Sequence, residues 1–305
     1  MLPFYLSKAT RPSPALHRDA PSVIRARIRA VTSACVISSL IAIYIIVQRG
    51  NASALEALHL LGWWPIPLLD VLKTLLLCMI LFVGPLFEAG IAEGQLWSWI
   101  KGEHIRETLG SWIGWRNLVA GPVTEELMFR SVIIPLHLLA NMDRTRIIFI
   151  TPLYFGIAHV HHFYEFVLTH PEAPIAAALL RSLVQFAYTS LFGFFAAFVF
   201  LRTGSLYAAI IAHSFCNWAG LPRFWGRLKV EASEPIAAPP AKKDAGEQAE
   251  AAPRRKPRKQ NLSIGWTVVY YALLFMGAGG FYYGLFPLTE SWNALVDFGR
   301  ASKSK

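Results

Sequence analysis

Charged residues are scarce in this sequence. They make up 16% of its 305 residues, against roughly a quarter in a typical soluble protein. Hydrophobic residues reach 54% and the mean hydropathy is +0.41. The apolar residues gather in blocks of about 20, which is the length that a helix needs to cross a bilayer. The shortage of charge therefore argues against an ordinary soluble protein and predicts an integral membrane protein.

Three other features are scarce or absent: paired cysteines, a signal peptide and an alternating pattern of apolar and polar residues. Cysteine occurs three times, at Cys35, Cys78 and Cys216, and an odd number inside apolar blocks argues against a disulfide framework. The first 30 residues contain no continuous apolar core, so no cleavable signal peptide is visible. Apolar and polar residues do not alternate, which excludes a membrane β-barrel and leaves helices as the structure that can span lipid. The predicted fold class is all-α, a polytopic bundle of transmembrane helices.

Acidic residues are also fewer than basic ones, 19 against 29, which gives a net charge of +10. The basic residues form two clusters, one between 11 and 29 and one between 242 and 259. A nucleic-acid partner is one interpretation of such clusters. Because both flank predicted spans, the positive-inside rule explains them better and places both in the cytosol. We expect contact with the lipid bilayer and no nucleic-acid partner.

Seven blocks are predicted to span the membrane: 30–47, 67–87, 124–139, 147–161, 173–201, 205–221 and 264–285. The tryptophan-rich stretch 93–117 is predicted to be an interfacial helix. Residues 231–260 are rich in alanine, proline and charge, which is typical of a disordered segment. The predicted regions are a cytosolic basic segment (1–29), a catalytic transmembrane core (30–225), a charged cytosolic linker (226–262), and a last span with its tail (263–305).

The strongest candidate for a functional site is the segment GPVTEELMFR. Pro122 suits the first turn of a helix, and the helix dipole favours carboxylates there. Glu126 and Arg130 are one turn apart and can pair, whereas Glu125 points about 100° away and can face a cavity. Alternatively, both glutamates are interfacial residues that favour the start of a helix.

A second element is PLYFGIAHVHH, in which Phe155 and His159 are one turn apart. His161 and His162 follow at the predicted membrane edge, with Glu165 beyond, and are interpreted as interfacial or supporting residues. A single histidine in a span is costly and indicates function, although it can also be a hydrogen-bonded packing residue.

The third element is HSFCN, which places His213 and Asn217 one turn apart. A histidine and an amide side by side can donate hydrogen bonds to an oxyanion, or simply join two spans. In the predicted topology all three elements reach a similar depth from the cytosolic side. A carboxylate beside a histidine can activate water, so together they could hydrolyse an amide without a covalent intermediate.

Other hydrolytic sites have less support. The sequence contains no H-E-x-x-H and no G-x-S-x-G motif. Cys216 lies near His213 and leaves a thiolate nucleophile as a minor alternative. Zinc held by Glu125, His159 and His213 is chemically possible, because histidine and carboxylate are zinc ligands. We prefer a metal-free reaction and expect no cofactor.

The three elements resemble the E-E-x-x-x-R, F-x-x-x-H and H-x-x-x-N motifs of the CAAX protease and bacteriocin-processing family. Further stretches are similar to its eukaryotic branch, the type II CAAX prenyl endopeptidases: RPSPALHRDAPSVIRARI, LFVGPLFE, RNLVAGPVTEELMFRS, FGIAHVHHF and FLRTGSLYAAIIAHSFCNWAGLP. The resemblance runs from about residue 11 to residue 222. Each motif alone is weak, and their ordered set is specific.

The resemblance implies eight spans around a cavity in the endoplasmic-reticulum membrane that opens toward the cytosol. Since seven are found, residues 1–6 are interpreted as the end of another span. The resemblance also implies that Glu125 is the base and that His159 assists it. His213 and Asn217 would form the oxyanion site. The supporting residues would be Glu126, Arg130 and Phe155.

The implied activity is removal of the C-terminal tripeptide from farnesylated or geranylgeranylated CAAX proteins, such as Ras-like small GTPases. A non-enzymatic scaffold of the same wider family is the main alternative. A small-molecule transporter is another, although no pair of similar halves with broken helices is evident.

Overall fold

The computed structural model describes residues 19–231 and 259–298. Within these ranges the chain is almost entirely helical, which confirms the predicted all-α class. The elements are α1 (Pro21–Gly50), α2 (Ala54–Leu60), α3 (Leu68–Leu81), α4 (Val83–Phe87), η2 (Glu88–Ala92), α5 (Leu96–Ile100), α6 (Glu103–Leu109), α7 (Trp112–Trp115), η3 (Arg116–Ala120), α8 (Gly121–Glu126), η4 (Leu127–Val132), α9 (Ile133–Leu139), α10 (Arg144–Ala158), α11 (His161–Thr169), α12 (Ile175–Thr203), α13 (Leu206–Ala219), β1 (Lys229–Glu231), β2 (Lys259–Asn261), α14 (Ile264–Gly284) and η5 (Pro287–Thr289).

Among the described residues, three helices are long and apolar enough to cross a membrane: α1, α12 and α14. A fourth span is possible if α3 and the α4–η2 segment are counted together, although they are bent by 76°. The predicted spans 124–139, 147–161 and 205–221 also lie on helices, but these are shorter or are divided by π-helical turns. Exposed apolar side chains on α1 and α14, among them Leu40 and Phe275, suit contact with lipid.

The bend after α3 differs from the single straight span predicted over 67–87. It occurs at Phe82, whose φ of −95° and ψ of 16° leave the helical range. Pro85 follows closely and cannot donate a backbone hydrogen bond. Gly84 packs against the backbone of α14, where an added Cβ would lie 3.2 Å from the Tyr270 carbonyl oxygen. The bend therefore lets α4 approach α14 closely.

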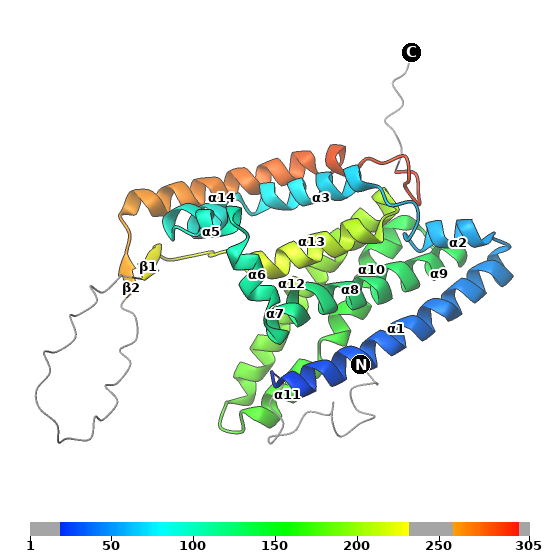
Figure 1. Cartoon of the computed structure of the whole chain (residues 1–305), viewed down its shortest axis with the longest axis horizontal. Coiled ribbons are helices and arrows are strands. Elements are labelled where there is room, and N and C mark those ends of the chain that lie inside the picture. Colours follow the sequence, from blue (N-terminus) through cyan, green and yellow to red (C-terminus); the bar gives the residue numbers. More distant parts are fainter. Residues whose placement is uncertain (1–18, 232–258, 299–305) are drawn as a thin grey trace, which may run out of the picture.

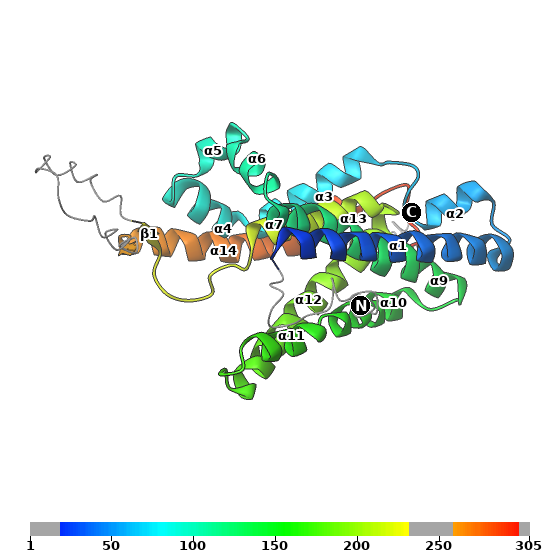
Figure 2. The same cartoon turned by 60° about the horizontal axis from the view of Figure 1, so that its bottom comes forward.

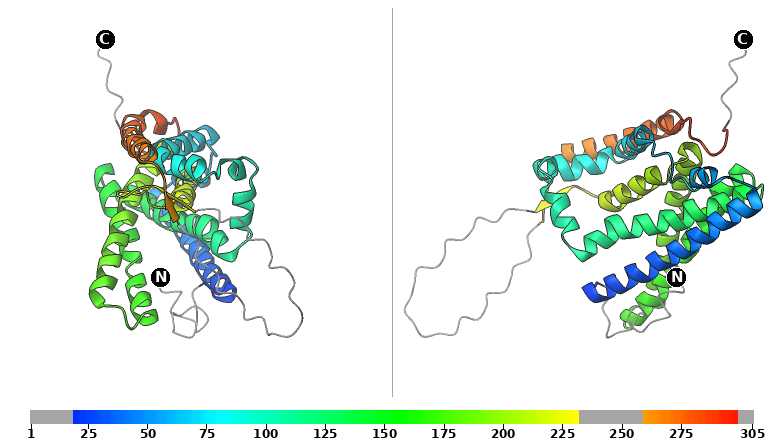
Figure 3. Two further views of the ribbon diagram at one scale, coloured as in Figure 1. Left: turned by 90° about the vertical axis from the view of Figure 1, so that its left-hand side faces the viewer. Right: turned by 45° about the vertical axis from the view of Figure 1, so that its right-hand side comes forward.

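Helix α13 occupies the centre of the arrangement. The α3–α14 pair lies on one side of it, and α8 with α1 on the other (Figures 1 and 3). Helices α10, α11 and the first half of α12 lie together on a further side (Figure 2). The start of α1, the end of α13 and the start of α14 lie toward the same end of the molecule (Figure 1). The starts of α1 and α14, whose flanking basic clusters are both predicted to be cytosolic, therefore lie toward the same end.

A continuous helical run from Trp112 to Leu139 carries the two glutamates. It contains two π-helical segments, η3 and η4, which lie immediately before and after α8. A π-helical turn inserts an extra residue and changes which face a side chain occupies, and such turns are frequent at functional sites. The stretch 93–117, predicted to be one interfacial helix, instead forms the short helices α5, α6 and α7, with breaks at 101–102 and 110–111, and α7 begins this run.

The predicted boundary at residue 29 differs from the structure. Helix α1 begins at Pro21, where the sequence predicted a separate basic segment up to residue 29. The predicted linker, 226–262, falls mostly outside the described residues, as does the proposed end of a span at 1–6. At the described flanks of this linker, β1 and β2 form a short antiparallel pair in which Val230 lies opposite Gln260.

Candidate active site

Glu125 lies on the wall of a cavity of about 450 Å³. The other walls come from the first half of α1, from η3 and η4, from the junction of α10 and α11, and from the end of α13. The side chain of Glu125 is 30% exposed, whereas Glu126 beside it has no exposed surface. The two adjacent carboxylates thus face different surroundings, as their 100° separation predicts.

Glu126 pairs with a cation and a histidine below the cavity wall. Its Oε1 accepts a hydrogen bond from Arg130 Nη1 at 2.9 Å and lies 2.6 Å from His213 Nδ1. Arg130 and His213 are also buried, at 1% and 6% exposure. The Glu126–Arg130 pair is the one that the i, i+4 spacing predicts, and the link to His213 joins α8 to α13.

His213 stands between the two glutamates. Because a carboxylate accepts hydrogen bonds, the contact with Glu126 places a proton on Nδ1 and leaves Nε2 pointing away from it. Nε2 lies 3.7 Å from Glu125 Oε2, which is too far for a direct hydrogen bond but close enough to share a water molecule or a reacting group. His213 therefore connects a buried charge network to the exposed carboxylate.

Aromatic rings enclose the guanidinium of Arg130. It lies over the rings of Phe155 and Phe192, at 4.9 Å and 5.6 Å from their centroids. The ring of Phe155 also packs edge-on against His159, at a centroid distance of 4.6 Å. The ring of Phe155 lies 6.1 Å from that of His213 as well, so it packs against the arginine and both histidines of the site without lining the cavity.

His159 reaches the cavity from the end of α10. Its Nδ1 donates to the carbonyl oxygen of Phe155 at 2.7 Å, one turn earlier in the chain. The lone pair of Nε2 is then the basic position of the neutral ring. The structure therefore brings Glu125 and His159, predicted from separate motifs, onto the walls of one cavity.

Asn217 also lines the cavity, but its amide is already engaged. Its Nδ2 donates to the carbonyl oxygen of Asn117 at 2.9 Å. An amide nitrogen carries two hydrogens, so one N–H remains for another acceptor. Asn117 itself, together with Arg116, is a cavity residue that the sequence interpretation did not single out, although both lie in the quoted stretch RNLVAGPVTEELMFRS.

Cys216 has no part in this arrangement. Its thiol contacts that of Cys78, and it is not among the residues that line the cavity. The thiolate alternative therefore has no support from the position of this side chain.

The metal ligands suggested by the sequence are not the ones that gather most closely. Among the described residues, a group whose ligand atoms all lie within 4.8 Å of one another consists of His161, His162 and Glu165. Glu125, His159 and His213 do not form such a group. Glu125 and His159 line the cavity, whereas His213 is not among its lining residues and lies behind Glu125. A carboxylate with two imidazoles in this arrangement is suited to proton transfer and to stabilising negative charge.

Comparisons with known proteins identify relatives of this chain. A profile of the family described as type II CAAX prenyl endopeptidase Rce1-like matches residues 107–219. The chain is 39% identical over 224 residues to the probable CAAX prenyl protease 2 of Schizosaccharomyces pombe, covering 73% of this chain and 78% of that protein. It is 35% identical over 242 residues to CAAX prenyl protease 2 of Homo sapiens, and this match covers 73% of this chain and 69% of that protein.

A similar protein of Arabidopsis thaliana, also named CAAX prenyl protease 2, is 47% identical over 115 residues, covering 38% of this chain and 37% of that protein. No solved structure gives a significant match. The matched region 107–219 contains all the residues of the candidate site from Glu125 to Asn217.

Proposed function

This chain belongs to the family of type II CAAX prenyl endopeptidases, and on that premise we propose that it is an intramembrane endopeptidase. Its substrates are proteins with a farnesylated or geranylgeranylated CAAX terminus, and its product is the released C-terminal tripeptide. The observation that carries the proposal is the placement of Glu125 and His159 on one cavity, with His213 directly behind Glu125.

In the proposed reaction Glu125 is the general base. A water molecule held by Glu125 and the Nε2 of His159 attacks the carbonyl carbon of the prenylated cysteine. Glu125 takes a proton from this water and later passes it to the departing amine, so the peptide bond breaks without a covalent enzyme intermediate. A base placed in this way contributes about 10²–10⁴-fold to the rate.

His213 and Asn217 stabilise the oxyanion that forms on the attacked carbonyl. Since Nδ1 of His213 is occupied by Glu126, its Nε2 can donate only when the ring carries both protons, and the reaction uses that form. The second N–H of Asn217 supplies the other donor. Glu126 and Arg130 act as positioning residues, because they hold His213 and do not line the cavity.

The walls of the cavity suit a lipidated peptide. Part of the lining is apolar and comes from α1 and η4: Ile24, Ile28, Val31, Met128 and Phe129. A volume of about 450 Å³ lies in the range of small-ligand sites, about 300–1,000 Å³. An isoprenoid or the aliphatic side chains of the tripeptide fit this apolar part, while the scissile bond meets Glu125.

We propose further that the enzyme needs no metal for hydrolysis and works in the endoplasmic-reticulum membrane with its cavity facing the cytosol. The two basic clusters support this orientation, as does the cytosolic origin of Ras-like substrates. Extensive treatment with a chelator should therefore leave the rate of tripeptide release unchanged.

Mass spectrometry of peptide products tests the proposal. The full chain, purified in detergent, is incubated with a farnesylated CAAX peptide and with the same peptide lacking the prenyl group. We expect release of the tripeptide from the first and little from the second. A folded protein that binds the prenylated peptide and releases no tripeptide would instead be a scaffold.

A further inference from the structure

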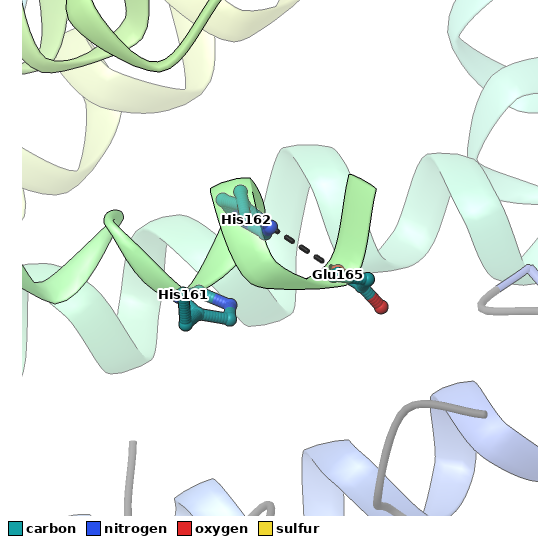
Figure 4. A group of neighbouring side chains, drawn as sticks. All are labelled: His161, His162 and Glu165. Atoms are coloured by element: carbon teal, nitrogen blue, oxygen red, sulfur yellow. Dashed lines mark hydrogen bonds and ion pairs between the residues drawn. The ribbon is translucent and has the colours of Figure 1, made fainter. Parts of the chain in front are cut away.

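The first turn of α11 carries a group of three potential metal ligands beside the candidate active site. They are His161, His162 and Glu165, and their ligand atoms all lie within 4.8 Å of one another. Figure 4 shows the three side chains on this turn, with the contact between His162 and Glu165 drawn as a dashed line. Both histidines line the cavity, whereas Glu165 is buried at 5% exposure.

Two of the three ligands are oriented by a partner on the atom that a metal would not use. His161 Nδ1 donates to the carbonyl oxygen of Ala158 at 2.8 Å, so the basic lone pair of the neutral ring is on Nε2. Glu165 Oε1 accepts a hydrogen bond from Arg27 Nη2 at 3.0 Å, while Oε2 turns toward His162. Ligating histidines and carboxylates in metal sites are usually held by such outer partners.

The spacing of the ligands also suits a small divalent ion. His162 Nδ1 and Glu165 Oε2 are 3.2 Å apart. In a tetrahedral zinc site with bonds of about 2.0–2.1 Å, neighbouring ligand atoms are about 3.3 Å apart. The rings of His161 and His162 have centroids 3.9 Å apart, and the ligand atoms of all three residues lie within 4.8 Å of one another.

We propose that His161, His162 and Glu165 form a binding site for a divalent transition-metal ion of the zinc type. Two imidazoles and one carboxylate are a common ligand set for zinc, whereas calcium and magnesium prefer oxygen ligands alone. A water molecule from the cavity would complete the four ligands. The hydrolytic reaction proposed above does not use this ion.

The site can be distinguished from the residues proposed for hydrolysis. His159 is the nearest of them to the three ligands along the chain, and its ring centroid is 5.8 Å from that of His162. Substitution of Glu125 should therefore leave metal binding unchanged, and substitution of Glu165 should remove a ligand. This separation makes the assignment testable one residue at a time.

The experiment is a zinc titration of the full chain in detergent, stripped of metal beforehand and competed against a zinc indicator dye of known affinity. We expect one equivalent to bind, and cobalt to give the absorption of a tetrahedral site. His162→Ala and Glu165→Gln should each lower the zinc affinity at least tenfold. His170→Ala, an exposed histidine directly after α11, is the matched control and should bind zinc as the wild type does.

Thermal unfolding provides a second measurement that reports on folding. Zinc should raise the unfolding temperature of the wild type and of Glu125→Gln, because an ion that binds the folded state stabilises it. It should not do so for Glu165→Gln; if that variant fails to fold, His161→Ala gives the same test. Unchanged zinc affinity in His162→Ala and Glu165→Gln would overturn the proposal, as would loss of binding in Glu125→Gln instead.

Discussion

Glu126 has no exposed surface, yet its carboxylate contacts both the guanidinium of Arg130 and the imidazole of His213. Burial of these groups is tolerated because each has a partner of complementary charge, although both contacts use Oε1 and Glu126 Oε2 is buried without a hydrogen-bond partner among the described residues. The network also fixes the ring of His213, so that Nε2 faces Glu125. The stability of the fold and the proposed hydrolysis therefore depend on the same side chains, and a test must measure the two effects separately.

Glu126→Ala tests the buried network. We expect it to lower the free energy of unfolding by about 3–5 kcal/mol, because it leaves the guanidinium of Arg130 buried without its partner. Chemical unfolding in detergent measures this change. Tripeptide release should also fall, since His213 loses the group that holds its Nδ1.

A double variant separates the two effects. Replacing both members of the pair, as in Glu126→Leu with Arg130→Met, removes the unpaired charge and should recover most of the lost stability. Hydrolysis should stay low in the double variant, because His213 is still unheld. Recovery of wild-type turnover along with stability would show that Glu126 only supports the fold.

Local spacing predicted part of this site. The i, i+4 spacing of Glu126 and Arg130 predicted their ion pair. The position of Glu125, about 100° away around the helix, predicted that its side chain faces a cavity. The contact between His213 and Glu126 joins residues 87 positions apart, and no local pattern encodes it. The same is true of the bond from Asn217 to the Asn117 carbonyl, which depends on how α13 packs against η3.

At the scale of helices, the close approach of α10 and α12 shapes the pocket around Arg130. Gly193 of α12 lies where an added Cβ would be 2.6 Å from Pro152 Cβ and 3.5 Å from Arg130 Nη2. Its carbonyl oxygen also accepts a hydrogen bond from Arg130 Nη2 at 3.4 Å. A glycine is needed here because the backbone of α12 passes directly over a proline of α10.

Gly193→Ala should therefore lower the free energy of unfolding by about 1–3 kcal/mol, the usual effect of overpacking. Activity should drop as well, because Arg130 and the residues that it holds must shift. The matched control is Gly279→Ala in α14, where an added Cβ meets nothing within 4 Å. Equal behaviour of the two variants in thermal unfolding would refute this explanation of the packing.

Periodicity and hydrophobicity located most helices but not their interruptions. The span predicted at 264–285 is observed as α14, Ile264–Gly284, and the one at 173–201 as α12, Ile175–Thr203. The bend after α3 and the π-helical turns beside α8 were not predicted. The bend accompanies a close approach between distant segments, Gly84 against α14, which a single stretch of sequence does not reveal.

At the scale of the whole molecule, the comparisons confirm the resemblance inferred from three ordered motifs. Orientation in the membrane stays a prediction that depends on the two basic clusters. Each lysine or arginine near the anionic cytosolic leaflet contributes about 1 kcal/mol to that preference. The orientation matters because cytosolic substrates can reach the cavity only if it faces them.

Glycosylation mapping tests this orientation. A loop with an Asn-x-Ser sequon inserted after Asn51, which follows α1, should be modified in endoplasmic-reticulum membranes. The same loop inserted between residues 232 and 258 should remain unmodified. Modification of the second insert would mean that Glu125, His159 and His213 face the lumen. The proposal that the substrates are cytosolic prenylated proteins would then have to be withdrawn.

The central claim is that Glu125 activates water for hydrolysis of a prenylated peptide. Its most direct test is the rate of tripeptide release by Glu125→Gln, beside Glu56→Gln as a matched control. Glu56 lies in a capping box at the start of α2, where glutamine also serves, so the control should fold and cleave normally. We predict that Glu125→Gln folds like the wild type and is slower by about 10²–10⁴-fold. Turnover of Glu125→Gln close to the wild-type rate would contradict the account.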